Sequence, residues 1–436
     1  MEFRHIPYLC IMKLILFSIL CCVITCTVTG TTVYADIASN FGLGADALSM
    51  SGAYTGVADD FSACYYNPGG LAFQRRPVFA HDRRGTSLSV GVGYIASMLW
   101  TKDAGSGRST ADIAPLTFEQ LGLTLGPSAL AGLLPQRRVY FGFAFYSPTD
   151  AIIGWKERNT SVDRYFVFYD NQNRIFGFLA DAAYRFNDHF SVGAGVNIYA
   201  ASKTVTNVNF VQSSFYHTEN NTILIKAAPV AGIMIKTGDG FKIGLSYRAE
   251  TKFNDYGVNN LFASGLLIYT QSFNYVRFFS PEQYAAGISY QSSSPVLLVS
   301  FDATYLRWSD FVDEQGDGAP PTSLFDTVVP RFGIRSTIQN NIDVSAGYAF
   351  IRSPVRDQTG VTNFLDSNKH LLSAGASYTF RSAGFWHNPI RLSAYIQDTL
   401  LQTRIVHKTQ AVPQYQEGYS FGGSIVDAGL ECRFVW

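Results

Sequence analysis

Apolar residues alternate with small or polar residues, with a period of two, through most of this chain. Between residues 372 and 381, one face of the repeat carries only apolar side chains, which are Leu372, Ala374, Ala376, Tyr378 and Phe380. Successive side chains of a β-strand point to opposite faces, so this period predicts strands rather than helices. We expect fourteen strands, near residues 87–100, 126–134, 138–147, 173–186, 189–203, 221–236, 240–252, 282–291, 295–308, 328–338, 341–352, 369–381, 389–406 and 420–436.

The connections between these expected strands alternate between short and long. Residues 187–188 and 339–340 form short connections, whereas 101–125, 204–220 and 253–281 form long ones. Short turns at one end and long loops at the other are typical of outer-membrane barrels, which also have an even strand count. The sequence therefore predicts an all-β, transmembrane antiparallel barrel in the Gram-negative outer membrane. The alternative is a soluble lipocalin-like barrel or sandwich with its apolar faces turned inward.

The composition excludes other classes of protein. Lys and Arg total 33, as do Asp and Glu, and charged residues make up only 15% of the chain. A disordered chain would be rich in charge and poor in aromatic residues, and a nucleic-acid binder would carry a basic excess. Aromatic residues make up 15% of the chain and there are 38 glycines, which suits a barrel with a crowded lumen.

Both ends of the chain carry features typical of targeting signals. Residues 1–35 read as a secretory signal peptide, with an apolar run after Lys13 and cleavage after Ala35, although a membrane anchor is the alternative. The mature chain would keep only Cys64 and Cys432, which form neither a disulfide framework nor a metal site by spacing. The chain ends with Phe434 and Trp436 on the lipid face, and a terminal aromatic resembles the signal read by the barrel-assembly machinery.

Residues 36–86 do not alternate and are rich in glycine and other small residues. A segment of this length ahead of a wide barrel, predicted over 87–436, is suited to act as a plug, or hatch, inside the lumen. A periplasmic tail or a cover for a strand edge is the alternative. Within this segment, the hatch and gating candidates are Asp59, Asp60, Asn67 and Pro68.

Several motifs resemble the FadL/TodX family of outer-membrane transporters for long-chain fatty acids and aromatic hydrocarbons. Residues 51–56, 58–60 and 67–68 are similar to the family's N-terminal hatch. The likeness continues in residues 184–197, 280–283, 308–311 and 370–378, and thus covers nearly the whole mature chain. The resemblance implies a barrel with a ligand pocket above the hatch. It also implies that Arg164, with Tyr165, holds the ligand's head group.

No catalytic constellation is visible in the sequence. It has no nucleophile elbow, no zinc-protease motif and no phosphate-binding loop, and its seven histidines lack metal-ligand spacing. We therefore expect neither an enzyme nor a cofactor or metal. The pair Asp59 and Asp60 is expected to make hydrogen bonds within the hatch rather than to bind a cation.

Arginines are the side chains best suited to hold a carboxylate, because the planar guanidinium matches its geometry. Strand parity places Arg248, Arg331 and Arg335 in the lumen. For each of them the ordinary alternative is an ion pair with a lumen acid, and the candidate acids are Asp302, Asp343, Asp427 and Glu431.

The expected loop 253–281 is unusually apolar, and Phe262 and Phe279 are its ligand-binding candidates. It is either a first docking groove for hydrophobic substrate or a pair of strand extensions packed on one another. The sequence thus predicts passive uptake of hydrophobic molecules through a lumen pocket gated by the hatch, with outer-membrane lipids as neighbours. The alternatives are a PorV-like barrel that binds or shuttles secreted proteins, and a general porin.

Overall fold

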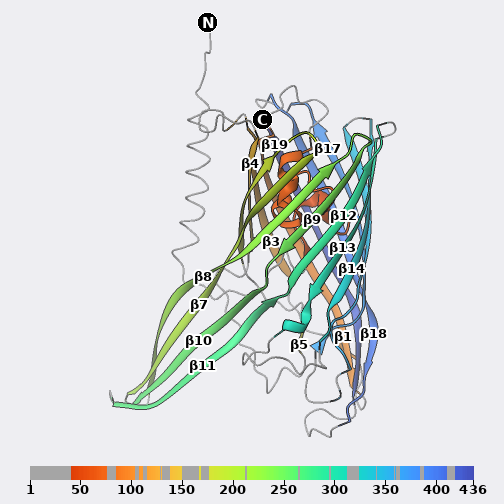
Figure 1. Cartoon of the computed structure of the whole chain (residues 1–436). Coiled ribbons are helices and arrows are strands. Elements are labelled where there is room, and N and C mark those ends of the chain that lie inside the picture. The colour runs from red at the N-terminus through yellow and green to blue at the C-terminus, as the bar shows by residue number, and fades with distance from the viewer. Residues whose placement is uncertain are drawn as a thin grey trace.

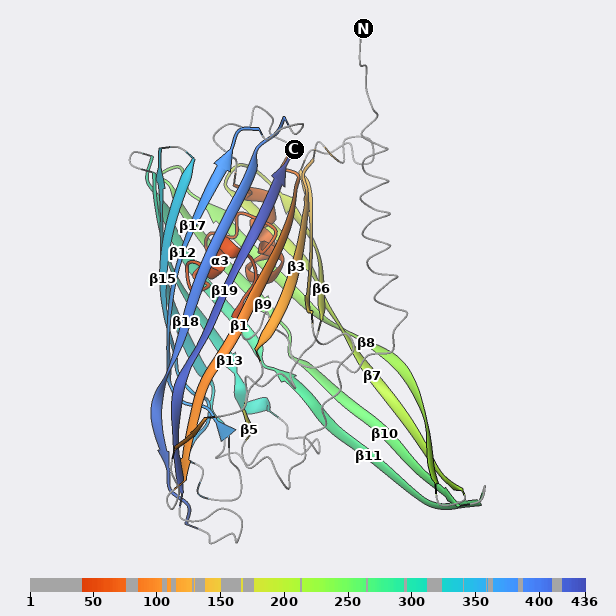
Figure 2. The same ribbon diagram turned by 180° about the vertical axis from the view of Figure 1, so that it is seen from behind.

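The computed structural model shows a tall barrel of tilted strands with a short helical segment inside one end (Figures 1 and 2). The structure describes residues 41–75, 85–103, 108–110, 115–127, 129, 138–149, 166–167, 176–211, 214–263, 266–293, 296–311, 324–339, 341–357, 359, 364–382, 387–409 and 418–436. Within these residues no helix is both long and apolar enough to cross a membrane.

Within the described residues, fourteen strands close the barrel, and each pairs antiparallel with its neighbours around the wall. In order around the wall they are β1 (Ser87–Asp103), β3 (Leu116–Leu125), β4 (Val139–Pro148), β6 (Gly177–Arg185), β7 (Phe190–Val211), β8 (Ser214–Lys236), β9 (Phe241–Arg248), β12 (Glu282–Gln291), β13 (Leu297–Arg307), β14 (Thr327–Ile338), β15 (Ile342–Ile351), β17 (Lys369–Phe380), β18 (Ile390–Val406) and β19 (Tyr419–Val435). The last strand returns to the first, from Ser87 opposite Val435 to Asp103 opposite Tyr419. Closure leaves no open edge in the wall, as a bilayer requires, and the predicted fold is confirmed.

The two faces of the wall follow the sequence alternation. On β17, Leu372 and Tyr378 are exposed, whereas Ser373 and Ser377 are buried. The outward row continues around the barrel in Val92, Leu245, Tyr284, Phe332, Leu392 and Leu430. The apolar face is therefore the outer, lipid-facing one, which excludes the soluble barrel with its apolar residues inside.

The predicted second strand at 126–134 is wrong. The strand in that place is β3, ten residues earlier, and it lies in a segment that was expected to be a loop. Its outward row runs through Glu119, which interrupts the apolar pattern, while Phe118 and Gln120 face inward and are buried. Gly126 and Pro127 follow the end of this strand. The charged side chain of Glu119 at an outward position therefore interrupts the apolar alternation, so the sequence pattern does not reveal this strand.

Two expected loops, 204–220 and 253–281, are also strands. The strands β7 and β8 stay paired out to Val211 and Ser214, and β10 (Thr251–Ala263) pairs with β11 (Leu266–Ser280) as a second long hairpin. The two hairpins join through a parallel pairing of β7 with β10, so the order is β8-β7-β10-β11. This four-stranded arm leaves the barrel sideways at the end away from the helical segment (Figures 1 and 2).

Smaller elements occupy the same end as the arm. They are β2 (Arg108–Thr110), which pairs with β1, the parallel pair β5 (Phe166–Val167) and β16 (Phe364–Leu365), and the turn η3 (Trp308–Asp310). The opposite end carries the C terminus and the short turns, among them 237–240 between β8 and β9. By the usual arrangement of such barrels, the short-turn end is periplasmic and the arm is extracellular.

Candidate functional site

The segment inside the barrel is built from short turns of small residues. It contains α3 (Ala45–Leu48), α4 (Ala63–Tyr66) and η1 (Pro68–Phe73), and these pack against strands of the wall. Ser51 and Gly52 both have positive φ and turn the chain sharply after α3. We call residues 41–75 the hatch. Together with residues 85–86, they are the described part of the predicted plug, residues 36–86.

Glycines of the wall make room for the hatch. On each of nine strands, an inward glycine lies so close to the hatch that an added Cβ would collide with it. These wall glycines are Gly122, Gly142, Gly193, Gly232, Gly244, Gly287, Gly333, Gly347 and Gly375. At Gly142, for example, the Cβ would lie 2.5 Å from the Cys64 Sγ and 2.6 Å from Leu71. The glycine-rich inner face of the alternation is thus explained by close contact with the hatch.

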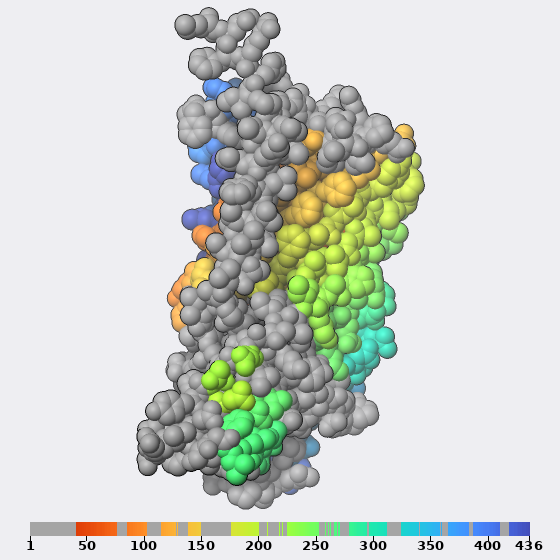
Figure 3. All heavy atoms as spheres, turned by 90° about the vertical axis from the view of Figure 1, so that its left-hand side faces the viewer, coloured from red at the N-terminus to blue at the C-terminus, as the bar shows by residue number. Residues whose placement is uncertain are grey.

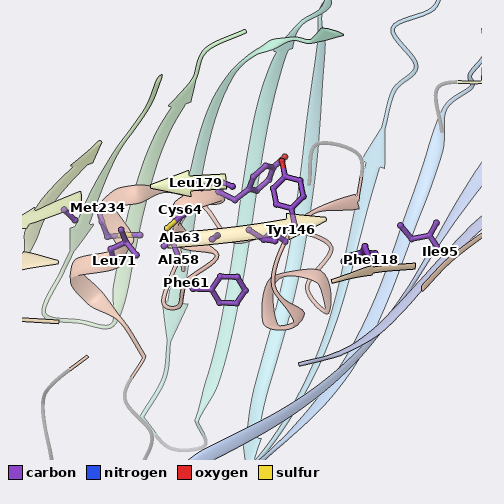
Figure 4. Packing of buried hydrophobic residues seen from close by; sticks show 14 of the residues in the cluster. Ala58, Phe61, Ala63, Cys64, Leu71, Ile95, Phe118, Tyr146, Leu179 and Met234 are labelled. Atoms are coloured by element: carbon purple, nitrogen blue, oxygen red, sulfur yellow. The ribbon is translucent and has the colours of Figure 1, made fainter. Parts of the chain in front are cut away.

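Apolar packing joins the hatch to one side of the wall. Phe61, Cys64 and Leu71 of the hatch are buried in one cluster with Tyr146 and Leu179 of the strands (Figure 4). Phe61 is only 1% exposed and its ring lies over Gly122, where any side chain would overlap it. Truncating a ring buried in this way costs about 3–5 kcal/mol in other proteins. This cluster therefore contributes strongly to holding the hatch in place.

The Asn67–Pro68 step is a polar anchor between the hatch and strands β7 and β8. The Asn67 amide donates hydrogen bonds to the carbonyl oxygens of Thr55 and Ile233, both at 3.0 Å, and its side-chain oxygen accepts one from the Gly69 N–H. Pro68 lies against Gly193 and Gly232 on the wall. The sequence motif therefore marks a contact point of the hatch with the wall.

Asp59 and Asp60 each bind an arginine of the wall. The Asp59 carboxylate lies 2.9 Å from the Arg335 guanidinium and accepts a 2.6 Å hydrogen bond from the Tyr54 hydroxyl. The Asp60 carboxylate lies 2.7 Å from the guanidinium of Arg433. Among the described residues no group of three or more His, Cys, Asp or Glu side chains is placed to hold a metal ion. These two residues are thus ion-pair partners of the wall.

A third hatch acid, Asp46, completes this network. Its carboxylate lies 2.8 Å from Arg391, which also pairs with Asp343, and Asp343 in turn lies 2.5 Å from Arg75 of the hatch. Glu431 pairs with Arg433 at 2.9 Å and accepts a hydrogen bond from the Ala45 N–H. We call this set the inner ion cluster; its members are Asp46, Asp59, Asp60, Arg75, Arg335, Asp343, Arg391, Glu431 and Arg433. It borders an open cavity of about 660 Å³ on the periplasmic side of the hatch.

The arginines of the cluster favour the ionised form of two hatch acids, Asp46 and Asp59. Burial alone raises the pKa of the Asp59 carboxyl, but Arg335 and Lys242 more than offset burial and lower that pKa below its usual range. The pKa of Asp46 is lowered in the same way, because Arg391 and Arg433 outweigh its burial. A buried ion pair of this kind gains little by itself, but removing one partner leaves a buried charge without compensation.

The three arginines predicted from parity all face the lumen, with different surroundings. Arg335 is 5% exposed and paired with Asp59 within the inner ion cluster. Arg248 stacks 3.6 Å from the centre of the Tyr65 ring and donates hydrogen bonds to the Tyr65 carbonyl and to Gln283. Arg335 therefore forms an ion pair, which was the alternative to ligand binding, whereas Arg248 binds an aromatic residue of the hatch.

Arg331 lies on the outer side of the hatch. It precedes Arg335 by four residues on β14, which is about 13 Å further toward the extracellular end. Its guanidinium donates to the Thr304 hydroxyl at 2.8 Å and lies near Gly52. Asp302 is directly opposite on β13, but its carboxylate is turned to the Thr55 N–H at 2.5 Å. Within the described residues, no carboxylate lies within ion-pair distance of Arg331, which stays partly exposed.

Tyrosines of α4 cover the hatch beside these two arginines. Tyr65 and Tyr66 meet edge to face with ring centres 5.0 Å apart, and Tyr66 also contacts Tyr54 at 5.6 Å. Neither tyrosine was a candidate from the sequence, although both directly precede the Asn67–Pro68 motif. Arg248, Arg331, Tyr65 and Tyr66 thus form a cluster of cations and aromatic rings, which we call the outer arginine site; Arg331 and Tyr66 are partly exposed, whereas Arg248 and Tyr65 are buried. The exposed part of such a cluster can hold an anionic group beside an apolar one.

The remaining candidates lie elsewhere or outside the described residues. Arg164 and Tyr165 are outside them. Phe279 is at the base of the arm, where its ring packs against Trp308 and Phe311 at 6.1 and 5.4 Å. Phe262 is near the tip of the arm, opposite Leu267. Twelve residues of β11 separate Leu267 from Phe279, about 40 Å of strand, so the two phenylalanines do not form one site.

The expected apolar loop is a pair of strand extensions in the arm. Leu266, Leu267 and Tyr269 near its tip are exposed, at 71%, 50% and 57%. Figure 3, which faces this side, shows the surface of β10 and β11 (green) below the wall of β6 to β8. Of the two interpretations, strand extension is what the structure shows, with apolar side chains presented at the extracellular end.

Similar proteins have this architecture. A crystal structure of a Pseudomonas aeruginosa FadL homologue has a TM-score of 0.59 and 15% identity, covering 93% of this chain and 99% of that one. The P. putida toluene transporter TodX has a TM-score of 0.57 and 14% identity, covering 91% and 99%. At these identities the likeness shows the fold alone.

Sequence comparison adds a curated relative and a family. Alkane uptake protein A of Marinobacter nauticus is 23% identical over 245 residues, which are 49% of this chain and 53% of the relative. The chain therefore spans about half the length of that relative. Residues 22–384 match the profile of the outer membrane protein transport proteins (OMPP1/FadL/TodX). Because this match covers most of the chain, the protein belongs to the OMPP1/FadL/TodX family of Gram-negative outer-membrane β-barrels.

Proposed function

We propose that this protein is a passive channel for hydrophobic molecules that carry a carboxylate, such as long-chain fatty acids. Membership of a family of transport proteins supports the general function. The observation that carries the substrate class is Arg331, a partly exposed lumen cation on the outer side of the hatch without a carboxylate partner among the described residues. A buried or half-buried cation of this kind binds an anionic group strongly, because little water competes for it.

The proposed route begins at the extracellular end. Hydrophobic substrate collects on the exposed apolar side chains of the arm, Leu266 and Leu267 among them. Its carboxylate then binds Arg331, with the buried Arg248 beside it, and its apolar body rests on the partly exposed ring of Tyr66. Arg164 and Tyr165 contribute to the same head-group site, as the family resemblance implies. Further passage requires the hatch to move away from the wall glycines, because contacts through Asn67 and Asp59 join it to several strands.

A binding experiment with two ligands tests the substrate class. Laurate and toluene are titrated into the detergent-purified protein, and affinities are measured by calorimetry for the wild type and for Arg331→Gln. A hydrogen bond to a charged group contributes about 1.5–3 kcal/mol, so laurate affinity should fall about ten- to a hundredfold. Toluene affinity should stay the same, because a neutral arene does not use the guanidinium.

The control is Arg307→Gln, an arginine at the extracellular end that pairs with Glu282 and Asp310 and lies outside the outer arginine site. Equal loss of laurate and toluene binding in Arg331→Gln would indicate a damaged barrel. Unchanged laurate binding would refute the head-group role, and Arg164→Ala would then be the next variant to measure. The names of the relatives TodX and alkane uptake protein A refer to neutral hydrocarbons. Tight toluene binding with no laurate binding would place this chain with them.

A further inference from the structure

Two arginines at the extracellular rim of the barrel stack on one aromatic ring. The guanidinium carbon of Arg352 lies 4.4 Å from the centre of the Phe325 ring, and that of Arg356 lies 5.2 Å from it. Both arginines are exposed, and they line an open cavity of about 630 Å³ together with Asn368, Gln402 and Arg404. We call Arg352 and Arg356 the rim arginines.

The rim arginines have no acceptor among the described residues. No hydrogen bond or ion pair joins either guanidinium to the described part of the chain, although each carries five N–H donors. The third arginine of the cavity, Arg404, is already engaged. It donates to the carbonyl oxygens of Asp366 and Arg356, at 3.0 and 2.6 Å, and lies 3.8 Å from the fully exposed Asp357. Among the described residues that line this cavity, three arginines stand against one exposed carboxylate, so these residues give the cavity a positive charge.

The position of the cavity relative to the bilayer follows from the strand register. Tyr348 and Phe350 are on the outward, lipid-facing row of β15, and both contact His370 of β17, with ring centres 6.0 and 5.4 Å apart. Aromatic residues of this kind form a girdle at the boundary between lipid tails and head groups. Arg352 comes two residues after Phe350 and just beyond the extracellular end of β15. Gln402, which lines the cavity, contacts the ring nitrogen of His370 at 2.8 Å.

These observations place positive charge at the head-group level of the outer leaflet. In a Gram-negative outer membrane that leaflet consists of lipopolysaccharide, whose lipid A carries phosphates at this level. Arginine is well suited to phosphate, because its planar donors bind two oxygens at once. Basic pockets beside the membrane bind lipid phosphates in other proteins by the same chemistry. Stacking on Phe325 holds both guanidinium planes and leaves their N–H edges for a ligand.

We propose that the rim arginines, on the Phe325 ring, form a binding site for a lipid A phosphate of outer-leaflet lipopolysaccharide. The site is separate from the outer arginine site in the lumen, and it does not depend on which molecule the channel carries. It fixes lipid to the wall beside β15, β17 and β18, at the end of the barrel opposite the hatch.

The test uses the full-length protein, delipidated in detergent and titrated with bisphosphorylated lipid A, with bound lipid counted by native mass spectrometry. The double variant Arg352→Gln/Arg356→Gln should bind lipid A at least tenfold more weakly than the wild type. Arg307→Gln is the matched control, since it removes another arginine of the extracellular end, one that already has the carboxylate partners Glu282 and Asp310. This variant should bind lipid A within twofold of the wild type. Heat-modifiable migration on a gel shows that each variant is a folded barrel.

Two further arms identify the source of the phosphate. Lipid A from which both phosphates have been removed should bind to the wild type and to the double variant with equal affinity. Inorganic phosphate at millimolar concentration should leave lipid A bound, because acyl chains against the barrel wall add to its affinity. Equal lipid A binding by the wild type and the double variant would overturn the proposal. Displacement by inorganic phosphate would also overturn it, by showing a site for a free anion.

Discussion

The two faces of the hatch use arginine in opposite ways, and one strand shows both. On the periplasmic face, Arg335 of β14 is 5% exposed and paired with Asp59. Four residues away on the same strand, Arg331 faces the extracellular side, where a hydroxyl is its partner and no described carboxylate pairs with it. Facing the lumen therefore does not by itself define the role of an arginine. A hatch carboxylate turns Arg335 into an ion-pair partner, whereas Arg331, which donates to a wall hydroxyl, keeps its charge without a described carboxylate.

The largest expected effect comes from breaking the inner ion cluster. Arg433→Met leaves Asp60 and Glu431 buried without their shared cation. Removal of one partner of a buried pair destabilises proteins by about 3–5 kcal/mol, so the midpoint of urea unfolding should fall markedly. Tryptophan fluorescence of the barrel in detergent measures this midpoint. Arg138→Met, at an exposed position on the periplasmic rim, is the control and should leave it nearly unchanged.

A side chain added to the wall should displace the hatch. At Gly232 a Cβ would collide with the Asn67 side chain and lie 2.9 Å from the Pro68 Cδ. Overpacking costs about 1–3 kcal/mol, so Gly232→Val should loosen the hatch and raise ion conductance in planar bilayers. Gly238→Val is the control, because nothing lies within 4 Å of a Cβ there. If the ion conductance of Gly232→Val equals that of the wild type, the hatch accommodates the added side chain without opening the pore, contrary to the prediction.

Acid should weaken the contacts on the periplasmic face of the hatch. The pKa values of Asp46 and Asp59 are lowered in the folded protein, so their contribution is complete above the unfolded value of about 3.9 and is lost as the pH falls below it. Each carboxylate then contributes a loss of up to about 1.4 kcal/mol per pH unit. Hydrogen exchange of hatch amides at pH 6 and pH 3 measures the change. Asp59→Asn should show a smaller difference between the two, and an identical difference would contradict the assignment.

The smallest expected effect is at the outer arginine site. Tyr65→Leu removes the ring on which Arg248 stacks. A cation–π contact contributes about 0.5–2 kcal/mol, so laurate affinity should fall by roughly two- to thirtyfold. Tyr140→Leu, on β4 at the periplasmic cavity, is the matched tyrosine control. An equal loss of affinity in both variants would show that the effect is not local.

The sequence predicts the barrel well because its main signal is local. Alternation needs only neighbouring residues, and it identifies the outward row of β17 and the inward orientation of Arg248, Arg331 and Arg335. It fails at β3, where Glu119 stands in the outward row, and in the arm, where the parallel pairing of β7 with β10 depends on contacts far apart in the chain. The sequence of either strand alone contains no pattern that specifies the register of this parallel pairing.

The candidate site was harder to predict, because its partners are separated by most of the chain. Asp59 and Arg335 are 276 residues apart, and Asp60 and Arg433 are 373 apart. The hatch sequence has no repeating pattern, so it does not indicate which hatch acid pairs with which strand. Asp46 is not among the candidates predicted from the sequence. Parity gave the correct face for three arginines, but it could not distinguish an ion-pair partner from a cation facing a tyrosine.

The wall glycines also constrain the order in which this molecule can be assembled. The hatch is made first, yet its contacts lie on strands made much later, and the Ala45 N–H binds Glu431 on the last strand, 386 residues on. Glu431 lies opposite Gly91 on β1, at the seam where the barrel closes. A wall closed around an empty lumen would leave its glycines facing water and would have to admit a folded segment afterwards. We therefore expect the N-terminal segment to be enclosed as the seam forms, so that deletion of residues 41–75 would slow insertion into the membrane as well as unplug the pore.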